Sequence, residues 1–530
     1  MRERLAIGAV ITALTFLSYF EFPGHTYLGS DTQIYVPMLE HIWDPSALTR
    51  DIVATKPHLA YTLYDEIAIA LRWLTHTSFQ TVLIAQQFLF RALEILGVYL
   101  LALSFPLARA RALTVAALFT LGATIAGPAV LVFEYEPVPR AFAIGLLFLA
   151  IGLVAQGHLM WADIVAAIAF LYHPPTVWVF WLLYLGLTLR HRDFRDLWPL
   201  AAGVTILFVS SRLQPGAPEH QVFFARVSPE LEKLQRMRAQ YNWVSTWTPA
   251  LLWQYMLLCI ASLAAFWRVK PKAARLFLIG MPALGILSVP LSYVLLEKLK
   301  WAFIPQFQPA RAVLFVIAFA VILGAAAGIR AAEQRRWIES VVWFALILTI
   351  PCAVPIFSIS GRNLALMFAL AAVLTCALWL QKWRYGWPLL AAAAIAPFFA
   401  LPHLAHVVNY RRVDLAAIED LAHFAQMQTP KDAVFLFGDA ESSPEPSIFR
   451  AEALRAVYVD WKSGGQINFS DVVAKEWWAR WQETNALHFD PSEVRRLRGL
   501  GIDYLVLPTA RRLDHQEPEY DNNRFAVYKL

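Results

Sequence analysis

The sequence predicts a polytopic α-helical membrane protein with about 13 transmembrane helices and a small C-terminal α/β domain. Hydrophobic residues make up 58% of the 530 residues and charged residues only 16%, a composition too apolar for a soluble globular protein. Apolar stretches of about 20 residues, the length that crosses a bilayer as a helix, recur from residue 4 to residue 408. Residues 410–530 contain no such stretch and therefore predict a separate domain.

The predicted spans fill most of the first 409 residues. They are residues 4–20, 80–105, 112–132, 139–156, 159–172, 174–189, 197–211, 250–267, 275–296, 310–329, 337–358, 363–381 and 387–408. The fifth and sixth spans meet at His173-Pro174-Pro175, where both prolines remove helix hydrogen-bond donors. These two spans form either two short crossings or a bent hairpin that does not fully cross, and neither alternative changes the topology downstream.

Basic residues in alternate loops predict the orientation of the chain. The loops on one side contain Arg109, Arg111, Arg192, Arg268, Lys270, Arg330, Arg335, Lys382 and Arg384. Positively charged loops remain in the cytoplasm, so the N-terminus is predicted to be cytoplasmic, and residues 21–79, 212–249 and 410–530 extracytoplasmic. The net charge of +6 therefore reflects topology, and no nucleic-acid partner is expected.

The chain is predicted to divide at residue 410. Residues 1–409 form the transmembrane domain, whose first extracytoplasmic loop, 21–79, carries juxtamembrane helices. In the remainder, segments 433–437, 456–459, 504–507 and 525–528 are typical of short strands. About 120 residues are enough for a hydrophobic core. Residues 410–530 are therefore predicted to be an extracytoplasmic α/β domain.

This organisation resembles the GT-C glycosyltransferase superfamily. The shared features are an N-terminal span, a long first outside loop with an acid near its start, about a dozen spans and a C-terminal extracytoplasmic domain. Several motifs look like those of an uncharacterised bacterial subgroup of GT-C-like membrane proteins: Asp31-Thr32-Gln33-Ile34-Tyr35, Pro139-Arg140-Ala141-Phe142-Ala143, His173-Pro174-Pro175-Thr176 and Val459-Asp460-Trp461-Lys462.

The resemblance implies a GT-C fold in the bacterial inner membrane. It also implies inverting transfer of a sugar from a polyprenyl-phosphate-linked donor to a glycan, lipid or protein acceptor on the extracytoplasmic face. Two rival functions remain open, and a protein that handles polysaccharide or lipid intermediates lies between them. One is a catalytically silent GT-C-fold scaffold or assembly protein for cell-envelope glycan, because a fold does not establish a function. The other is a lipid or polysaccharide transporter, although the sequence has one broken helix and no related halves.

Asp31 is the candidate catalytic base. A carboxylate at the membrane surface can take a proton from an acceptor hydroxyl while the lipid phosphate leaves. The alternative is that Asp31 caps the helix that begins at Thr32. Further polar residues of the first loop are expected to line the substrate cavity, and these are Tyr35, Glu40, Asp44, Arg50 and Asp51.

Cations near the outside ends of spans are candidates for binding the donor phosphate. They are Arg140, Arg212, Lys298, Lys300 and Arg311. For Arg140 the alternative is an interfacial anchor that extends toward the headgroups. His173 is expected to line a wet cavity, because a broken helix in a membrane must face protein or water. The alternative for His173 is an interfacial turn of a helix hairpin.

Glu134 and Glu136 are spaced to hold, together with Asp31, a divalent cation, Mg²⁺ or Mn²⁺, against a pyrophosphate. Two carboxylates separated by one residue point the same way from an extended segment. A solvated acidic turn is the alternative. No cofactor beyond this cation is expected, and the remaining partners are the lipid bilayer, the lipid-linked donor and the acceptor.

Overall fold

The structure, a computed structural model, describes residues 2–56, 61–191, 194–214, 225–352, 354–381, 386–410, 413, 415–484, 491–514 and 516–530. Arg192, Lys382 and Arg384, which contribute to the predicted orientation, lie outside these residues. The chain divides into two compact units. Unit 1 contains Met1–His25, Ile84–Val209 and Tyr241–Tyr410, and unit 2 contains Thr26–Leu83, Ser210–Gln240 and Arg411–Leu530.

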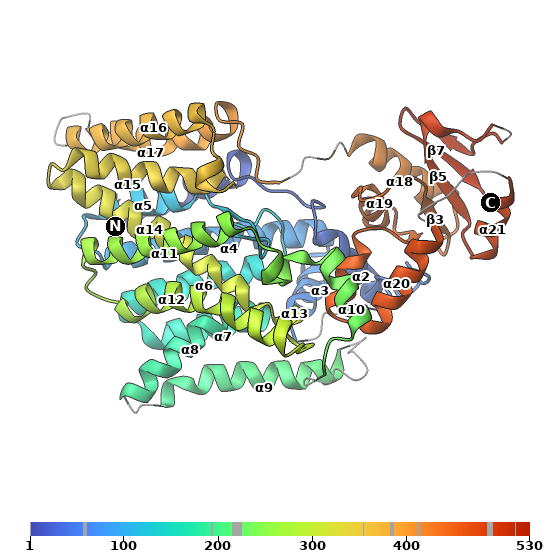
Figure 1. Cartoon of the computed structure of the whole chain (residues 1–530), viewed down its shortest axis with the longest axis horizontal. Coiled ribbons are helices and arrows are strands. Elements are labelled where there is room, and N and C mark those ends of the chain that lie inside the picture. The colour runs from blue at the N-terminus through green and yellow to red at the C-terminus, as the bar shows by residue number, and fades with distance from the viewer. Residues whose placement is uncertain are drawn as a thin grey trace. The chain divides into compact units, whose positions relative to one another are not determined.

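Unit 1 is built from long apolar helices, several of which run side by side (Figure 1). In chain order the helices that contribute to it are α1 (Arg2–Phe16), α4 (Phe79–Leu103), α5 (Arg109–Phe119), α6 (Pro139–Ala155), α7 (Leu159–Tyr172), α8 (Pro174–His191), α9 (Trp198–Leu213), α11 (Pro249–Val269), α12 (Arg275–Ser292), α13 (Ile304–Phe307), α14 (Val313–Glu333), α15 (Trp337–Thr349), α16 (Gly361–Leu380) and α17 (Gly386–His403). α14 is the central helix, because it packs against α5, α11, α12 and α15. The most apolar stretch of the segment Ile304–Glu333 is buried along its whole length.

The protein is a multi-pass membrane protein. Seven helical segments within the described residues are long and apolar enough to cross a bilayer: Glu3–Glu21, Phe79–Leu103, Pro249–Val269, Arg275–Lys298, Ile304–Glu333, Gly361–Leu380 and Gly386–His403. Pro139–Ala155, Leu159–Tyr172 and Trp337–Cys352 are shorter apolar helices. Large apolar side chains such as Leu5, Trp253 and Ile260 are exposed on the spanning segments, as expected where lipid replaces water.

The span predicted at residues 112–132 is wrong. Residues 112–132 do not form a continuous helix, because α5 ends at Phe119 and the chain continues into the antiparallel hairpin β1 (Thr124–Ile125) and β2 (Val130–Leu131). Gly122 and Gly127 have φ values of +68° and +83°, a backbone conformation that a right-handed helix does not contain. The apolar composition of this segment therefore reflects burial within unit 1.

Glycines allow α4 and α6 to approach closely. A Cβ on Gly152 would lie 2.4 Å from the carbonyl oxygen of Gly97, and a Cβ on Gly97 would lie 2.3 Å from the carbonyl carbon of Phe148. Small residues at such contacts are typical of helix packing in membranes. The close approach fixes the helix that carries Arg140 against α4.

Unit 2 combines three separate parts of the chain. Its helices are α2 (Thr32–Trp43), α3 (Tyr64–Thr75), α10 (Pro229–Arg238), α18 (Ala416–Gln428), α19 (Glu445–Ala453), α20 (Asp471–Thr484) and α21 (Pro491–Gly499). α19 packs against α2, and α10 packs against α20 and the helical turn Ser463–Asn468. The first loop and the C-terminal segment therefore fold together.

A five-stranded mixed sheet lies in the C-terminal part of unit 2. It contains β3 (Val434–Phe437), β4 (Ala456–Val457), β5 (Tyr504–Pro508), β6 (Tyr520–Asp521) and β7 (Phe525–Lys529), in the order β4-β3-β5-β7-β6. β3 is parallel to β4 and β5, whereas β7 is antiparallel to β5 and β6. The aromatic rings of Phe435, Phe449 and Tyr504 pack together, with Phe435 4.8 Å from each of the other two ring centroids.

Candidate functional site

Asp31 forms an ion pair with Lys462, a residue of the C-terminal segment. The Lys462 Nζ donates a hydrogen bond of 2.7 Å to Asp31 Oδ1 and another of 2.8 Å to Ser30 Oγ. The exposed fraction of the side chain is 30% for Asp31 and 18% for Lys462. Both charged groups therefore lie within unit 2 at a position that a ligand from solvent can reach.

The capping alternative for Asp31 does not describe its side chain. Asp31 directly precedes α2 and already has a helical backbone, with φ −76° and ψ −26°. Within the described residues, its carboxylate makes no capping hydrogen bond to the N-terminus of α2. The carboxylate meets the ammonium of Lys462 instead.

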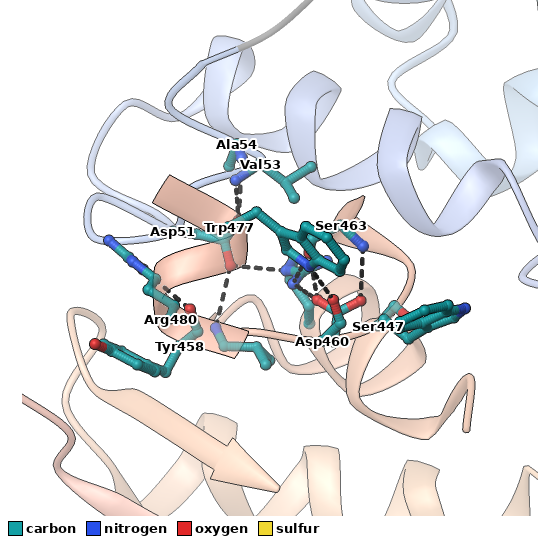
Figure 2. A network of polar contacts seen from close by, with 12 residues as sticks. Asp51, Val53, Ala54, Ser447, Tyr458, Asp460, Ser463, Trp477 and Arg480 are labelled. Carbon is teal, nitrogen blue, oxygen red and sulfur yellow. Dashed lines mark hydrogen bonds and ion pairs between the residues drawn. The ribbon is translucent and has the colours of Figure 1, made fainter. Parts of the chain in front are cut away.

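A buried polar network, which includes Asp51, Asp460 and Ser463 (Figure 2), binds the chain on both sides of Lys462. Arg450, on α19, donates from Nε to Asp51 Oδ2 at 2.7 Å and from Nη2 to Ser463 Oγ at 2.9 Å. The same Nη2 also donates to Asp460 Oδ2. The side chains of Arg450, Asp51 and Asp460 are completely buried. The network therefore joins the first loop, α19 and the segment on both sides of Lys462.

The remaining hydrogen bonds of Asp51 are also internal. Its two carboxylate oxygens accept hydrogen bonds from the backbone N–H groups of Val53 at 2.9 Å, Ala54 at 3.1 Å and Val457 at 3.1 Å. Asp51 is thus a structural anchor between the first loop and β4 in this conformation. Its predicted place in a substrate cavity stays a prediction.

The charges of the network stabilise one another despite burial. Burial alone would raise the pKa of Asp460, but the charge of Arg450 and hydrogen bonds from Ser463 hold that pKa below its ordinary value. Burial alone would lower the pKa of Arg450, but Asp460 and Asp51 raise it above its ordinary value. Asp460 and Arg450 therefore each favour the charged state of the other, as a buried ion network requires.

Tryptophan side chains cover the same loop. Trp477 Nε1 donates a hydrogen bond of 2.9 Å to the carbonyl of Asp460 (Figure 2). Its ring lies so close to Gly464 that a Cβ there would be 2.5 Å from a ring carbon. The carbonyl of Trp461, the residue directly before Lys462, accepts a hydrogen bond of 2.9 Å from Arg238 Nε. The backbone around Lys462 is thus fixed on both sides.

Unit 1 brings together two of the cations predicted to bind phosphate. Arg140, in the first turn of α6, and Arg311, just before α14, line one cavity with Pro175 and Thr176. His173 lies at the break between α7 and α8, and its Nδ1 is 2.7 Å from Thr176 Oγ1. The broken helix therefore borders a small cavity whose lining includes Arg140 and Arg311.

Glu134, one of the two acids predicted to hold a cation, forms an ion pair with Arg140. The guanidinium of Arg140 donates to both carboxylate oxygens of Glu134, with an Nη2–Oε2 distance of 3.3 Å. Both Glu134 and Glu136 are buried. Among the described residues, no group of three or more His, Cys, Asp or Glu side chains is placed to hold a metal ion. Cation binding by Glu134 and Glu136 therefore stays a prediction.

The other predicted site residues meet neighbours within their own unit. In the first loop the pairs are Tyr35 with Tyr64, Glu40 with Arg72, Asp44 with Ser46, and Arg50 with Asp503. Among the cations, Lys298 lies over the ring of Tyr293 and Lys300 over that of Trp243, each at 5.2 Å, and Arg212 lies in the last turn of α9. The roles predicted for these residues remain untested.

The sequence interpretation did not assign Lys462 and Arg450 to the site. Lys462 is 431 residues from Asp31, and Arg450 is 399 residues from Asp51. The available signal was the motif Val459-Asp460-Trp461-Lys462, which contains Lys462 and the buried Asp460. A motif alone does not identify a partner so distant in the chain.

Comparisons with known proteins address the fold. The model of a domain of unknown function, DUF6798, matches residues 416–484. No curated protein matches the sequence. The structure is similar to ArnT from Cupriavidus metallidurans in the apo state, with 15% sequence identity, a TM-score of 0.51, and coverage of 99% of this chain and 97% of ArnT.

Two further solved structures are similar. The structure of the same ArnT bound to undecaprenyl phosphate has 14% identity, a TM-score of 0.50, and coverage of 99% of this chain and 96% of that one. The arabinofuranosyltransferase AftD from Mycobacteria has 16% identity and a TM-score of 0.44, and the match covers 98% of this chain and 36% of AftD. The likeness to ArnT supports the GT-C fold that the sequence resemblance implies.

Proposed function

We propose that this protein is an inner-membrane glycosyltransferase that moves a sugar from a polyprenyl-phosphate-linked donor to an acceptor on the extracytoplasmic face. The observation that carries the proposal is the partly exposed carboxylate of Asp31, which is held by Lys462 and does not cap its helix. The fold adds support, because ArnT, which shares it, has been solved with undecaprenyl phosphate bound. A glycan, lipid or protein could provide the acceptor hydroxyl.

In the proposed reaction, Asp31 acts as the general base. Its carboxylate takes the proton of the acceptor hydroxyl, and the acceptor oxygen forms a bond to C1 of the sugar. The bond between C1 and the phosphate oxygen breaks, and the lipid phosphate leaves with the bonding electron pair. Attack from the face opposite the phosphate would invert the configuration at C1.

Arg140 and Arg311 line the same small cavity of unit 1, which has room for about one water molecule, so a phosphate bound there would require the cavity to open. Guanidinium groups bind phosphate through charge-assisted hydrogen bonds, and Arg140 already binds a carboxylate, that of Glu134. A donor-phosphate role for Arg140 and Arg311, and for Arg212, Lys298 and Lys300, remains part of the proposal. So does binding of Mg²⁺ or Mn²⁺ by Glu134 and Glu136.

The Asp31→Asn variant tests the proposal. Asparagine keeps the size of the side chain and removes the basic carboxylate, so consumption of the donor should fall by about a hundredfold or more. Purified wild-type and variant proteins would be given a panel of polyprenyl-phosphate sugars, and donor consumption would be followed. Asp471→Asn is the matched control. Asp471 pairs with Lys475 on the exposed surface of α20, so this substitution is expected to leave donor consumption unchanged.

Two outcomes would count against the proposal. Equal donor consumption by wild type and Asp31→Asn would remove Asp31 from the mechanism. If the wild type consumed no donor of the panel, a catalytically silent scaffold with this fold would become the better interpretation.

A further inference from the structure

Lys462 has two partners from the first loop, and one of them is the proposed base. Its ammonium donates to Asp31 at 2.7 Å and to Ser30 at 2.8 Å. We propose that Lys462 is a ligand for the phosphate group of a polyprenyl phosphate, and that this phosphate displaces the Asp31 carboxylate from the ammonium. The assignment of Asp31 as base rests on the proposed function, whereas the binding step can be measured by itself.

The chemistry of the ion pair permits this exchange. An ammonium carries three donors on a flexible stem, so Lys462 can turn toward an anion while it keeps the bond to Ser30. A phosphate presents more acceptor oxygens than a carboxylate and binds lysine strongly. Because Asp31 and Lys462 are partly exposed, the energy that holds the pair together is small enough for a ligand to overcome.

The surroundings keep the lysine in place while its partner changes. Asp460 precedes Lys462 by two residues and Ser463 follows it directly, and both are bonded to the buried Arg450. Trp477 also holds the Asp460 carbonyl at 2.9 Å. The backbone is therefore fixed, so only the side chain needs to reorient, and little conformational entropy is lost on binding.

The exchange links donor binding to base activation. While Lys462 is paired with Asp31, the positive charge of the ammonium stabilises the carboxylate anion and makes it a weaker base. With the phosphate bound, the ammonium faces the group that leaves with the electron pair of the broken C1–O bond. The Asp31 carboxylate, no longer bonded to Lys462, then accepts the proton of the acceptor hydroxyl. The base thus becomes available only when the anionic donor is present.

The test measures binding of undecaprenyl phosphate to the purified full-length protein in detergent. Lys462→Met keeps the length of the side chain and removes the charge, so affinity should fall by about tenfold to a hundredfold. Lys462→Arg should retain most of the affinity. Asp31→Asn should bind several times more tightly than wild type, because the competing carboxylate is absent. Undecaprenol, which lacks the phosphate, should bind all variants equally and reports that they are folded.

Lys56→Met is the matched control. Lys56 pairs with Glu476, so it also joins the first loop to the C-terminal segment, but this pair does not include Asp31. Its loss should leave undecaprenyl phosphate binding unchanged. A decrease equal to that of Lys462→Met would mean that the ion pairs only hold unit 2 together, and would overturn the proposal.

Three other results would also overturn it. One is unchanged binding by Lys462→Met, and another is weaker binding by Asp31→Asn. The third is a Lys462-dependent response to inorganic phosphate but not to undecaprenyl phosphate, which would assign the site to a free anion. If the wild type consumed donor but Lys462→Met bound the lipid as well as the wild type does, this inference would be wrong and the proposed function would remain intact. Lys462-dependent binding without donor consumption would support the inference and remove the proposed function.

Discussion

Asp31 and Asp51 are acids of the same loop with opposite surroundings. The Asp51 side chain is completely buried and bonded to Arg450 and to backbone N–H groups, whereas 30% of the Asp31 side chain is exposed beside Lys462. A buried carboxylate with all these partners stabilises one conformation. Separating a partly exposed ion pair costs little free energy. Asp51 is therefore a structural anchor in this conformation, whereas Asp31 keeps a carboxylate that a ligand can reach.

Arg450→Met should destabilise the protein strongly. The substitution leaves Asp51 and Asp460 buried without their cation, which typically costs about 3–5 kcal/mol. Arg511→Met is the comparison, because Arg511 pairs with Asp439 on the surface and its loss should change the stability little. Thermal unfolding followed by tryptophan fluorescence would compare them, and equal midpoints for both variants would contradict the structural role of the network.

Residue by residue, the sequence identifies groups whose role depends on local context. Asp31 is identifiable because it follows an apolar span, and His173 because two prolines follow it. Lys462 and Arg450 are not identifiable in this way, since their partners come from the first loop, hundreds of residues away. One sequence contains no information about pairs at that separation.

At the scale of elements, breaks are predictable where proline or glycine enforces them. α7 ends at Tyr172 and α8 begins at Pro174, as the His173-Pro174-Pro175 motif indicates. The hairpin of β1 and β2 within residues 112–132 was missed, because a short apolar strand and a buried helix have the same hydropathy. Periodicity therefore predicts long helices better than short buried strands.

The start of α3 gives a prediction on pH. Burial, and then a hydrogen bond and charge repulsion from Glu66, raise the pKa of Asp65 far above its usual range. The folded state thus keeps a proton that the unfolded state releases above about pH 4. The contribution of Asp65 to stability should fall as the pH rises from there through the raised pKa.

Asp65→Asn imitates the protonated side chain and should remove this dependence. The variant is expected to unfold at a higher temperature than wild type at pH 8, and the difference should shrink as the pH falls toward 4. Unfolding midpoints of both proteins across this pH range provide the measurement. A difference that is constant with pH would show that Asp65 is ionised in the folded protein.

For the whole molecule, composition and hydropathy were sufficient to predict a polytopic membrane protein, because only lipid tolerates so much apolar surface. They could not predict which segments fold together. Unit 2 contains Thr26–Leu83, Ser210–Gln240 and Arg411–Leu530. These ranges overlap closely with residues 21–79, 212–249 and 410–530, the segments that the basic loops predict to be extracytoplasmic.

This overlap gives a prediction on topology. Segments that fold into one compact unit must lie on one side of the membrane, so Leu530 should be on the same side as Asp31. Alkaline phosphatase fused after Leu530 should be active in the periplasm, and green fluorescent protein fused there should be dark. Fusions after Arg335, in a loop predicted to be cytoplasmic, should give the opposite result. Fluorescence from the fusion at Leu530 would show that unit 2, which includes Asp31 and Lys462, lies on the cytoplasmic face. The proposed extracytoplasmic transfer would then be wrong.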